Sequence, residues 1–229
     1  MSNILVKLEN VSKNYDKGRT TALNNINLDI TKGSSVSIIG PSGSGKSTLL
    51  NLIGALDIPD KGSIKINGQE ISEIKDLNHF RRETIGFVFQ LHNLIPNITS
   101  RENVELPLYG TGLSAKEMKK RALELLKSVS LEKMADKKPN ILSGGERQKV
   151  AVARALANKP TIILADEPTG SLDTENSKII LDLLRKHQTE LGATLIIVTH
   201  DHQIAKQTEQ TIKIIDGQTS NRHHVLPKN

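Results

Sequence analysis

The stretch Gly40-Pro-Ser-Gly-Ser-Gly-Lys-Ser47 decides the fold of this chain. It matches the pattern G-x-x-x-x-G-K-[ST] at every fixed position. An apolar run at residues 36–39 precedes it and a helix-forming stretch begins at Lys46, so the loop joins a buried strand to a helix. Its glycines let backbone N–H groups face a bound phosphate, and the helix N-terminus adds positive potential. The sequence predicts a nucleotide site in which Lys46 contacts the outer phosphates and Ser47 ligates Mg²⁺.

A second glycine-rich segment, Leu142-Ser-Gly-Gly-Glu146, also precedes a helix-forming stretch. Ser143 and Glu146 have the spacing of a capping box, so one interpretation is a tight turn that only caps the helix. The other interpretation is a second phosphate cradle, because bare backbone N–H groups again lie at a positive helix end. Two such loops in one chain suggest that a single triphosphate is bound from both sides.

The composition is that of an ordinary globular protein, with 36% hydrophobic and 24% charged residues. The absence of cysteine excludes a disulfide framework and a thiolate metal site. No apolar run approaches the length of a membrane span and the first residues lack a signal-peptide pattern, so we expect a cytosolic chain. The net charge is +6, but basic and aromatic residues do not interleave, so we expect solvated basic faces and no nucleic-acid partner.

Hydrophobic patterns predict where strands and helices lie. Alternating apolar residues near 4–8 and 26–30 predict half-exposed antiparallel strands. Helical spacing prevails between residues 91 and 157, where a capping box at Ser114 and Glu117 opens one helix. Further helices are expected at residues 46–56, 147–157 and 174–189. Further strands are expected at residues 36–39, 64–68, 85–89, 161–165, 195–199 and 211–215.

Strands that alternate with helices indicate an α/β fold with a mostly parallel sheet and helices on its faces. The early alternating strands add an antiparallel β part, and the central helical stretch forms an inserted helical subdomain. We therefore expect one domain over residues 1–229. Its sheet-based core lobe covers about residues 1–90 and 158–229, and its helical lobe covers about residues 91–157. The last residues, 221–229, are expected to form a loose tail.

Two adjacent acids, Asp166 and Glu167, follow the strand expected at residues 161–165. Ligands of open α/β sheets bind at the carboxyl ends of strands. Neighbouring residues of an extended strand point opposite ways, so the acids can have different roles: Asp166 holds Mg²⁺ through water, and Glu167 faces the attacking water. The alternative is a pair of solvated loop residues, and the phosphate loop in the same chain favours the functional interpretation.

Three further polar residues stand at the ends of expected elements. His200 ends the strand at residues 195–199 and can donate to a terminal phosphate or hold the water-activating group; a purely structural histidine is the alternative. Gln90 closes the strand at residues 85–89, where its amide could sense Mg²⁺ and the γ-phosphate at the hinge between the lobes. Asp173 precedes a helix and could be only its N-cap.

Together these segments resemble the ATP-binding subunit of ABC transporters over essentially the whole chain. The first glycine loop resembles the Walker A loop of P-loop NTPases, and residues 162–167 resemble Walker B with its catalytic glutamate. The segment from Leu142 to Glu146 resembles the ABC signature, the motif most specific to this family. Gln90 corresponds to the Q-loop, Ser171-Leu-Asp173 to the D-loop and His200 to the switch histidine.

The resemblance implies an ATPase that converts ATP and water to ADP and phosphate with Mg²⁺. It implies that Lys46, Glu167 and His200 are catalytic, and that Ser47, Gln90 and Asp166 hold the metal. Tyr15 falls where the family places an aromatic ring that stacks on adenine, although a strand-end core residue is the alternative. The residues implied to bind the nucleotide are Tyr15, Gly40, Pro41, Ser42, Gly43, Ser44, Gly45, Lys46, Ser47, Thr48, Gln90, Ser143, Gly144, Gly145 and Asp173.

The resemblance also implies a head-to-tail homodimer on ATP binding, in which Lys46 of one copy and the Ser143 loop of the other bind the same ATP. Residues 81–90, 93–96 and 102–107 resemble the MacB/LolD-type branch, whose permeases export lipoproteins, peptides or drugs or drive extracytoplasmic work. We expect a separate permease that contacts residues 91–108 and holds the chain, cytoplasmic and peripheral, at the inner face of the cell membrane. The alternative is an FtsE-like regulatory ATPase that signals through a membrane partner without transport.

Overall fold

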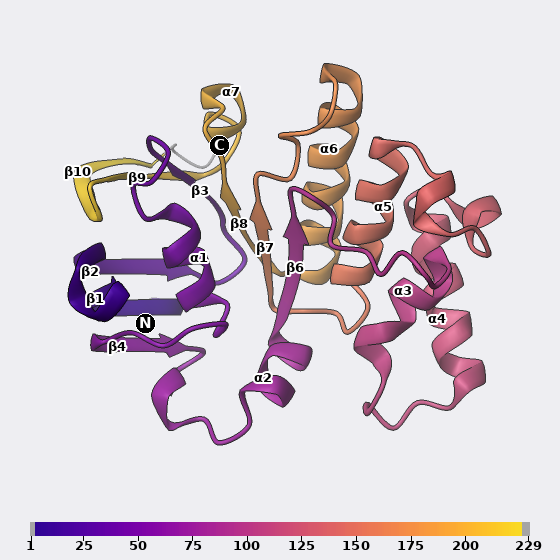
Figure 1. The fold of residues 1–229 in the computed structure, drawn as a ribbon, viewed down its shortest axis with the longest axis horizontal. Coiled ribbons are helices and arrows are strands. Elements are labelled where there is room, and N and C mark those ends of the chain that lie inside the picture. The colour runs from indigo at the N-terminus through magenta and orange to yellow at the C-terminus, as the bar shows by residue number, and fades with distance from the viewer. Residues whose placement is uncertain (1–2, 226–229) are drawn as a thin grey trace. The chain divides into compact units, whose positions relative to one another are not determined.

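The computed structural model describes residues 3–225, with side chains described up to residue 220. They belong to two compact units, one comprising Met1–Arg81 and Thr194–Asn229 and the other Arg82–Ala193 (Figure 1). The second unit contains the whole helical stretch expected at residues 91–157. Where functional lobes divide stays a prediction. Within the described residues, no helix combines the length and the apolar character needed to cross a bilayer.

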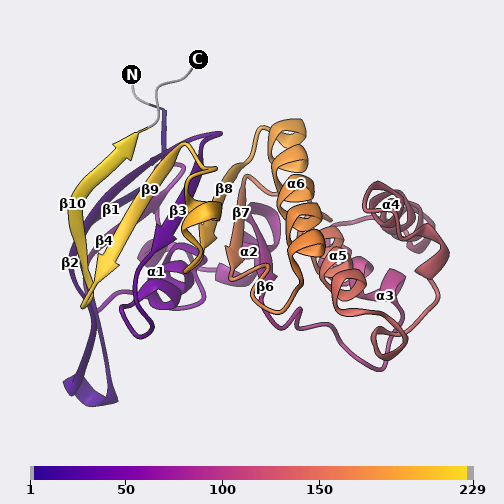
Figure 2. The same cartoon turned by 90° about the horizontal axis from the view of Figure 1, so that it is seen from above.

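An antiparallel sheet in the first unit has the strand order β2-β1-β4-β5. Its strands are β1 (Ile4–Tyr15), β2 (Thr20–Thr31), β4 (Lys61–Ile66) and β5 (Gln69–Glu70). Of these, β1, β2 and β4 are labelled in Figure 2. The apolar side chains of Val6 and Leu8 are buried while those of Lys7 and Glu9 are partly exposed, which confirms the predicted half-exposed strands. β4 turns into β5 through Asn67 and Gly68, both with positive φ (51° and 79°), as an Asn-Gly hairpin requires.

The remaining strands of the first unit follow the order β10-β9-β3-β8. They are β3 (Ser35–Ile39), β8 (Thr194–Val198), β9 (Gln210–Ile215) and β10 (Gln218–Val225). β3 is parallel to both β8 and β9, whereas β10 is antiparallel to β9. Helices α1 (Lys46–Ile53) and α7 (His202–Ala205) belong to the same unit. α1 ends three residues earlier than predicted, because Gly54 takes the C-cap position.

The predicted loose tail at residues 221–229 is wrong as far as residue 225, because β10 extends to Val225. The strand escaped prediction since its sequence is polar and does not alternate. It is held by backbone pairing with β9, for example Thr219 opposite Ile214 and His224 opposite Thr211. The last four residues of the expected tail lie outside the described residues.

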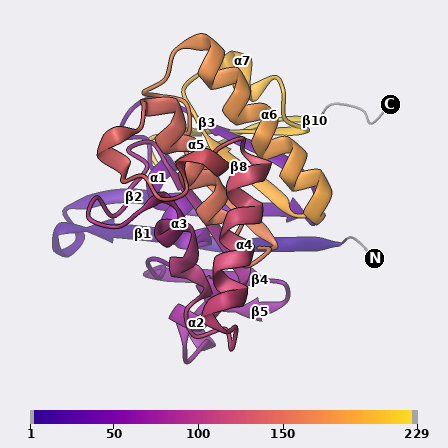
Figure 3. The same ribbon diagram turned by 90° about the vertical axis from the view of Figure 1, so that its right-hand side faces the viewer.

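The second unit combines two parallel strands with a group of helices. β6 (Ile85–Phe89) pairs with β7 (Ile162–Asp166), so that Ile85 lies opposite Ile162 and Phe89 opposite Asp166. Helix α2 (Leu77–Thr84) leads directly into β6. α3 (Ser100–Glu105), α4 (Ala115–Ser128) and α5 (Gly144–Ala155) pack on one another, and α6 (Thr174–Leu191) packs on α5 (Figure 3). These elements confirm the predicted α/β class.

The helices of the second unit begin where their caps place them. Thr99, Ser114 and Ser143 each form a full capping box before α3, α4 and α5. The boxes at Ser114 and Ser143 confirm two sequence predictions. Because Ser143 is itself the N-cap, α5 starts at Gly144, three residues before the predicted start.

Candidate active site

The glycine loop of the first unit has a backbone that only glycine can adopt at two points. At Gly40 a Cβ atom would lie 2.1 Å from the backbone oxygen of Ile214 in β9. At Gly45, where φ is 103°, a Cβ atom would lie 2.4 Å from the backbone oxygen of Ala22 in β2. The loop therefore packs tightly against two strands, and this packing fixes the position at which α1 begins.

Helix α1 begins without a side-chain cap, because Gly45 occupies its N-cap position. By contrast, α3 to α7 begin at Thr99, Ser114, Ser143, Asp173 and Asp201, each of which accepts a backbone N–H. The first N–H groups of a helix need acceptors, and a bound phosphate provides them where no side chain does. The N-terminus of α1 thus has the form of an anion site.

Two buried polar groups inside the loop also fit a phosphate ligand. Lys46 is only 8% exposed, and its Nζ donates to the backbone oxygen of Pro41 at 2.7 Å. Within the described residues no carboxylate pairs with Lys46, and the buried Oγ of Ser44 has no hydrogen-bond partner. Burial of an ammonium group whose partner is a carbonyl oxygen costs free energy, unless an anion binds beside it. Ser47 and Thr48 follow Lys46 in the first turn of α1.

Tyr15 and His200 belong to this unit as well. Tyr15 ends β1 with 36% of its surface exposed, so the alternative of a core residue is wrong, while its contact with adenine stays a prediction. His200 is exposed, and one residue, Thr199, separates it from the end of the buried strand β8. It therefore lies beyond the carboxyl end of β8, as predicted.

In the second unit, the predicted acids and Gln90 end neighbouring strands. β7 ends at Asp166, Glu167 follows it, and Gln90 follows the last residue of β6. Since Phe89 pairs with Asp166, the three side chains start from the same edge of the two parallel strands. Both acids are half-buried, and Glu167 has a positive φ of 46°, a strained backbone for a non-glycine residue.

The segment after Glu167 lies against Gln90. A Cβ atom at Gly170 would lie 2.8 Å from the amide nitrogen Nε2 of Gln90. The Oγ of Ser171 donates to the backbone oxygen of Gln90 at 3.4 Å. The structure therefore brings together the Q-loop and D-loop positions that the sequence predicted separately.

The glycine signature lies against the start of α6. A Cβ atom at Gly145 would lie 2.5 Å from Oδ1 of Asn176, and one at Gly144 would lie 3.7 Å from Cδ2 of Leu172. Asp173 accepts the backbone N–H of Asn176 at 2.8 Å, so its predicted role as an N-cap is confirmed. The phosphate contacts of Ser143, Gly144, Gly145 and Asp173 stay predictions.

The capping box of the signature keeps one carboxylate ionised. Glu146 accepts the backbone N–H of Ser143 at 2.8 Å, while the Oγ of Ser143 accepts the backbone N–H of Glu146 at 3.2 Å. The backbone and side-chain hydrogen bonds from Ser143 lower the pKa of Glu146. Ser143 therefore orders the N-terminus of α5, whatever ligand that terminus binds.

Sequence reasoning missed three residues that connect the signature helix to the Q-loop. Arg154 donates to the backbone oxygens of Asn93 at 2.7 Å and His92 at 2.8 Å, and Gln148 donates to that of Phe89 at 3.3 Å. Burial lowers the pKa of Arg154, and burial is also the largest of the causes that lower the pKa of His92. The sequence feature that could have revealed Arg154 is its place in a run of otherwise apolar, mostly small residues at 150–157, because a charged residue in such a run indicates a buried polar contact.

The donor set expected for Mg²⁺ differs from that of a resident metal centre. Among the side chains that the structure describes, no three His, Cys, Asp or Glu residues gather to hold a metal ion. Ser47, Gln90 and Asp166 offer a hydroxyl, an amide oxygen and one carboxylate. These are hard oxygen donors of the kind Mg²⁺ accepts when phosphate oxygens and water complete its shell. The chemistry of each donor suits a metal that arrives with a nucleotide, and that the three share one Mg²⁺ stays a prediction.

The sequence matches the ABC transporter family over residues 23–170. The lipoprotein-releasing system ATP-binding protein LolD of Bacteroides thetaiotaomicron is 49% identical over 215 residues, which cover 93% of this chain and 98% of that protein. The ABC transporter ATP-binding protein MJ0796 of Methanocaldococcus jannaschii is 51% identical over 222 residues, covering 93% of this chain and 94% of that protein.

Solved structures agree with the sequence relatives. The dimeric post-hydrolysis structure of MJ0796 bound to ADP and phosphate has a TM-score of 0.89 at 49% identity, covering 98% of this chain and 100% of that one. CbiO1 of Clostridium perfringens has a TM-score of 0.86 at 32% identity, covering 95% of this chain and 87% of that one. On this agreement of sequence and fold, the chain belongs to the ABC transporter family and is an ATP-binding, ATP-hydrolysing subunit of the LolD-like type.

Proposed function

We propose that two copies of this chain enclose ATP and Mg²⁺ between them and use hydrolysis to drive a separate membrane permease. The first glycine loop (residues 40–47) carries the proposal, because the uncapped N-terminus of α1 and the buried Lys46 both favour an anion at the end of this loop. The relative LolD is named for lipoprotein release. We propose export of lipoproteins, peptides or drugs, or mechanical work outside the cytoplasm, by a complex that holds this chain at the inner face of the cell membrane.

Each catalytic side chain has a separate task in this proposal. Lys46 and the backbone N–H groups of the loop bind the outer phosphates, and Ser47, Gln90 and Asp166 hold Mg²⁺, which neutralises phosphate charge when bound. Glu167 orients or deprotonates the attacking water, an effect worth about 10²–10⁴-fold. His200 donates to the γ-phosphate as charge develops on its oxygens.

The dimer supplies what one copy lacks. MJ0796 forms dimers in two of its solved structures, and one of them holds ADP and phosphate. In the proposed dimer, Gly144 and Gly145 of one copy approach the γ-phosphate bound by Lys46 of the other, with Asp173 beside the same interface. Hydrolysis removes the phosphate that both copies contact, so the dimer opens. A permease can read this two-state equilibrium.

Substitution of Glu167 by glutamine tests the dimer. The amide cannot act as a base, so Glu167→Gln should lower ATP hydrolysis by at least about 10²-fold and accumulate as an ATP-bound dimer in gel filtration with light scattering. Glu132→Gln is the control, because Glu132 is an exposed acid in a short 3-10 turn of the same unit. The proposal is wrong if Glu167→Gln stays monomeric with saturating ATP and Mg²⁺.

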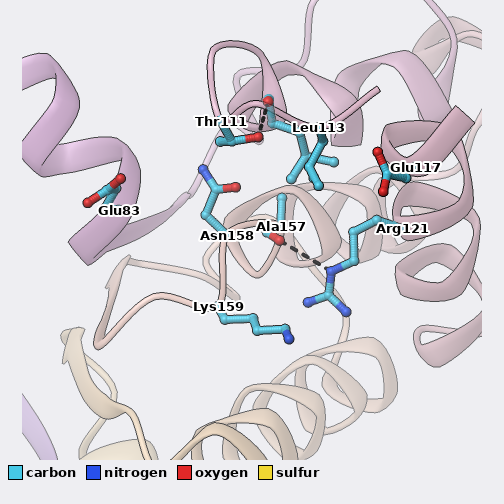
Figure 4. Close-up of a pocket in the computed structure, with 9 residues that line it drawn as sticks. Glu83, Thr111, Leu113, Glu117, Arg121, Ala157, Asn158 and Lys159 are labelled. Carbon is cyan, nitrogen blue, oxygen red and sulfur yellow. Dashed lines mark hydrogen bonds between the residues drawn. The ribbon is translucent and has the colours of Figure 1, made fainter. Parts of the chain in front are cut away.

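A cavity in the second unit is our proposed docking place for a cytoplasmic segment of the permease. Its volume is about 510 Å³, and one of the residues that line it is Leu108, the end of the stretch predicted to contact the permease. Leu108, Leu113 and Ala157 give it an apolar side. Glu117 and Arg121 lie beside them, with the Arg121 guanidinium bonded to the backbone oxygen of Ala157 (Figure 4). A short amphipathic helix that carries both signs of charge suits such a lining.

The absence of cysteine makes this docking place testable. Leu113→Cys introduces a single thiol at the cavity, and Leu56→Cys introduces one at a similarly exposed leucine of the first unit. A thiol-linked photo-crosslinker should capture the co-expressed permease from Leu113→Cys and not from Leu56→Cys. Capture only from Leu56→Cys would refute the docking place. If the captured partner raises ATP hydrolysis yet moves no cargo in vesicles, the FtsE-like alternative replaces transport.

A further inference from the structure

The ring of Tyr15 is held by residues of the loop that follows α1. Its hydroxyl donates to Oδ2 of Asp57 at 3.1 Å. The Nζ of Lys13 donates to Oδ1 of the same carboxylate at 2.7 Å and to the backbone oxygen of Ile58 at 2.8 Å. The same Nζ lies 5.4 Å from the centroid of the Tyr15 ring, within the range of a cation–π contact.

The ion pair between Lys13 and Asp57 is stronger than an ordinary surface pair. Lys13 is only 8% exposed, and Asp57 is half-buried. Burial opposes the charge of Lys13, but the hydrogen bond and charge of Asp57 raise its pKa above the ordinary value. Burial likewise opposes ionisation of Asp57, but bonds from Lys13, Ile58 and Tyr15 hold its pKa below the ordinary value. Both groups are therefore ionised at neutral pH.

Asn14, which lies between Lys13 and Tyr15, is hydrogen-bonded to the same loop. The backbone N–H of Asn14 donates to Oδ2 of Asp60 at 2.6 Å, and its side chain reaches the same oxygen at 3.3 Å. Three consecutive residues at the end of β1 are thus tied to residues 57–60. This loop leaves the C-terminal end of α1, whose N-terminus forms the phosphate site. One short structural element therefore carries the phosphate cradle at one end and holds the aromatic ring at the other.

We propose that Lys13 and Asp57 are positioning residues for the base of the nucleotide: they orient the Tyr15 ring so that adenine stacks on the face away from Lys13. This rests on the proposed adenine contact of Tyr15. Because one face of the ring has a cation above it and the hydroxyl is anchored, the ring has a single orientation before a nucleotide arrives. Preorganisation of this kind lowers the entropic cost of binding.

Binding of ADP and of pyrophosphate, measured by calorimetry with Mg²⁺, tests the proposal, since only ADP has a base. Lys13→Met and Asp57→Ala should each weaken ADP binding by roughly five-fold, the worth of one lost hydrogen bond. Pyrophosphate binding should not change. In steady state, KM for ATP should rise by the same factor with kcat unchanged, because the base contact is equal in the ground and transition states. Lys7→Met is the matched control, since Lys7 lies on the same strand and the two side chains of its ion pair with Glu9 are 42% and 43% exposed.

A double-mutant cycle tests the route through the tyrosine hydroxyl. Tyr15→Phe removes only that hydroxyl, so it should cost little further affinity when combined with Asp57→Ala. Additive losses would overturn the route. Equal losses of ADP and pyrophosphate affinity would show that Lys13 and Asp57 act only on the fold. If Tyr15→Ala weakens ADP binding while Lys13→Met and Asp57→Ala do not, this inference alone fails. If Tyr15→Ala leaves ADP binding unchanged, the adenine contact fails with it.

Discussion

Replacement of Gly145 by alanine places a methyl group where Asn176 already lies. The new Cβ would be 2.5 Å from Oδ1 and 2.8 Å from Cγ of Asn176, both well inside van der Waals contact. Asn176 cannot turn away freely, because its Nδ2 donates to Oδ2 of Asp173 at 2.8 Å. Relief of the overlap must therefore break the contact between the side chains that begin α6, or shift α5.

The opposing effects can be weighed. Overpacking costs about 1–3 kcal/mol, and loss of the Asn176–Asp173 hydrogen bond adds about 0.5–1.5 kcal/mol. Alanine in place of glycine in a helix returns up to about 1 kcal/mol. We therefore expect Gly145→Ala to lower the free energy of unfolding by about 1–3 kcal/mol, or the melting temperature by about 3–8 °C for a chain of this size.

Thermal denaturation followed by circular dichroism measures this effect, and two further variants sharpen it. Gly144→Ala is the matched control, because its Cβ would lie at an ordinary 3.7 Å from Leu172; it should keep the wild-type melting temperature. Any loss of ATP hydrolysis in Gly144→Ala then reports on the ligand side of the signature. In the Asn176→Ala background, the nearest remaining atom is the Asn176 Cβ position at 3.5 Å, so Gly145→Ala should be tolerated there. Equal destabilisation by Gly144→Ala and Gly145→Ala, or no rescue by Asn176→Ala, would refute the reasoning.

Two other predictions concern caps and the Q-loop. Hydrogen bonds within the capping boxes lower the pKa values of Glu102, Glu117 and Glu146. The ionised carboxylates therefore stabilise the fold above the ordinary pKa of glutamate, and this stabilisation is lost as the pH falls from there through the lowered pKa values. Melting temperature should thus be level near neutral pH and decline below about pH 4.5, less steeply when all three are glutamine; an unchanged slope contradicts this. Arg154→Met leaves two backbone oxygens without their donor, which should lower the free energy of unfolding by about 2–4 kcal/mol. It should also expose residues 91–98 to limited proteolysis. Protection equal to that of the wild type would show that the Arg154 hydrogen bonds do not hold this segment in place.

Apolar runs bounded by glycine or polar residues predicted strands well. β6 was predicted to the residue, because Ile85 and Phe89 stand between a charged segment and Gln90. α2 was missed since only Phe80 is buried along it, so no apolar period marks the helix. β10 was missed for a related reason: an edge strand held by backbone pairing needs no apolar alternation.

The site divides in the same way. Residues of the P-loop, the paired acids and the signature were predicted from their motifs, because each motif lies within a few consecutive positions. His92, Gln148 and Arg154 were not predicted as a group, since they meet only when α5 packs against the segment after β6. Their residue types alone are compatible with a solvent-exposed helix and loop.

The sequence by itself determined the interactions that act over one helical turn or one tight turn. The capping boxes at Ser114 and Ser143, the Asp173 cap and the Asn-Gly hairpin are of this kind, because their partners are at most three residues apart. Only the tertiary structure decided that Asn176 confines Gly145 and that Asp57 orients Tyr15. Such contacts depend on how separately formed elements pack, and packing is governed by the shapes of all the side chains in the interface at once.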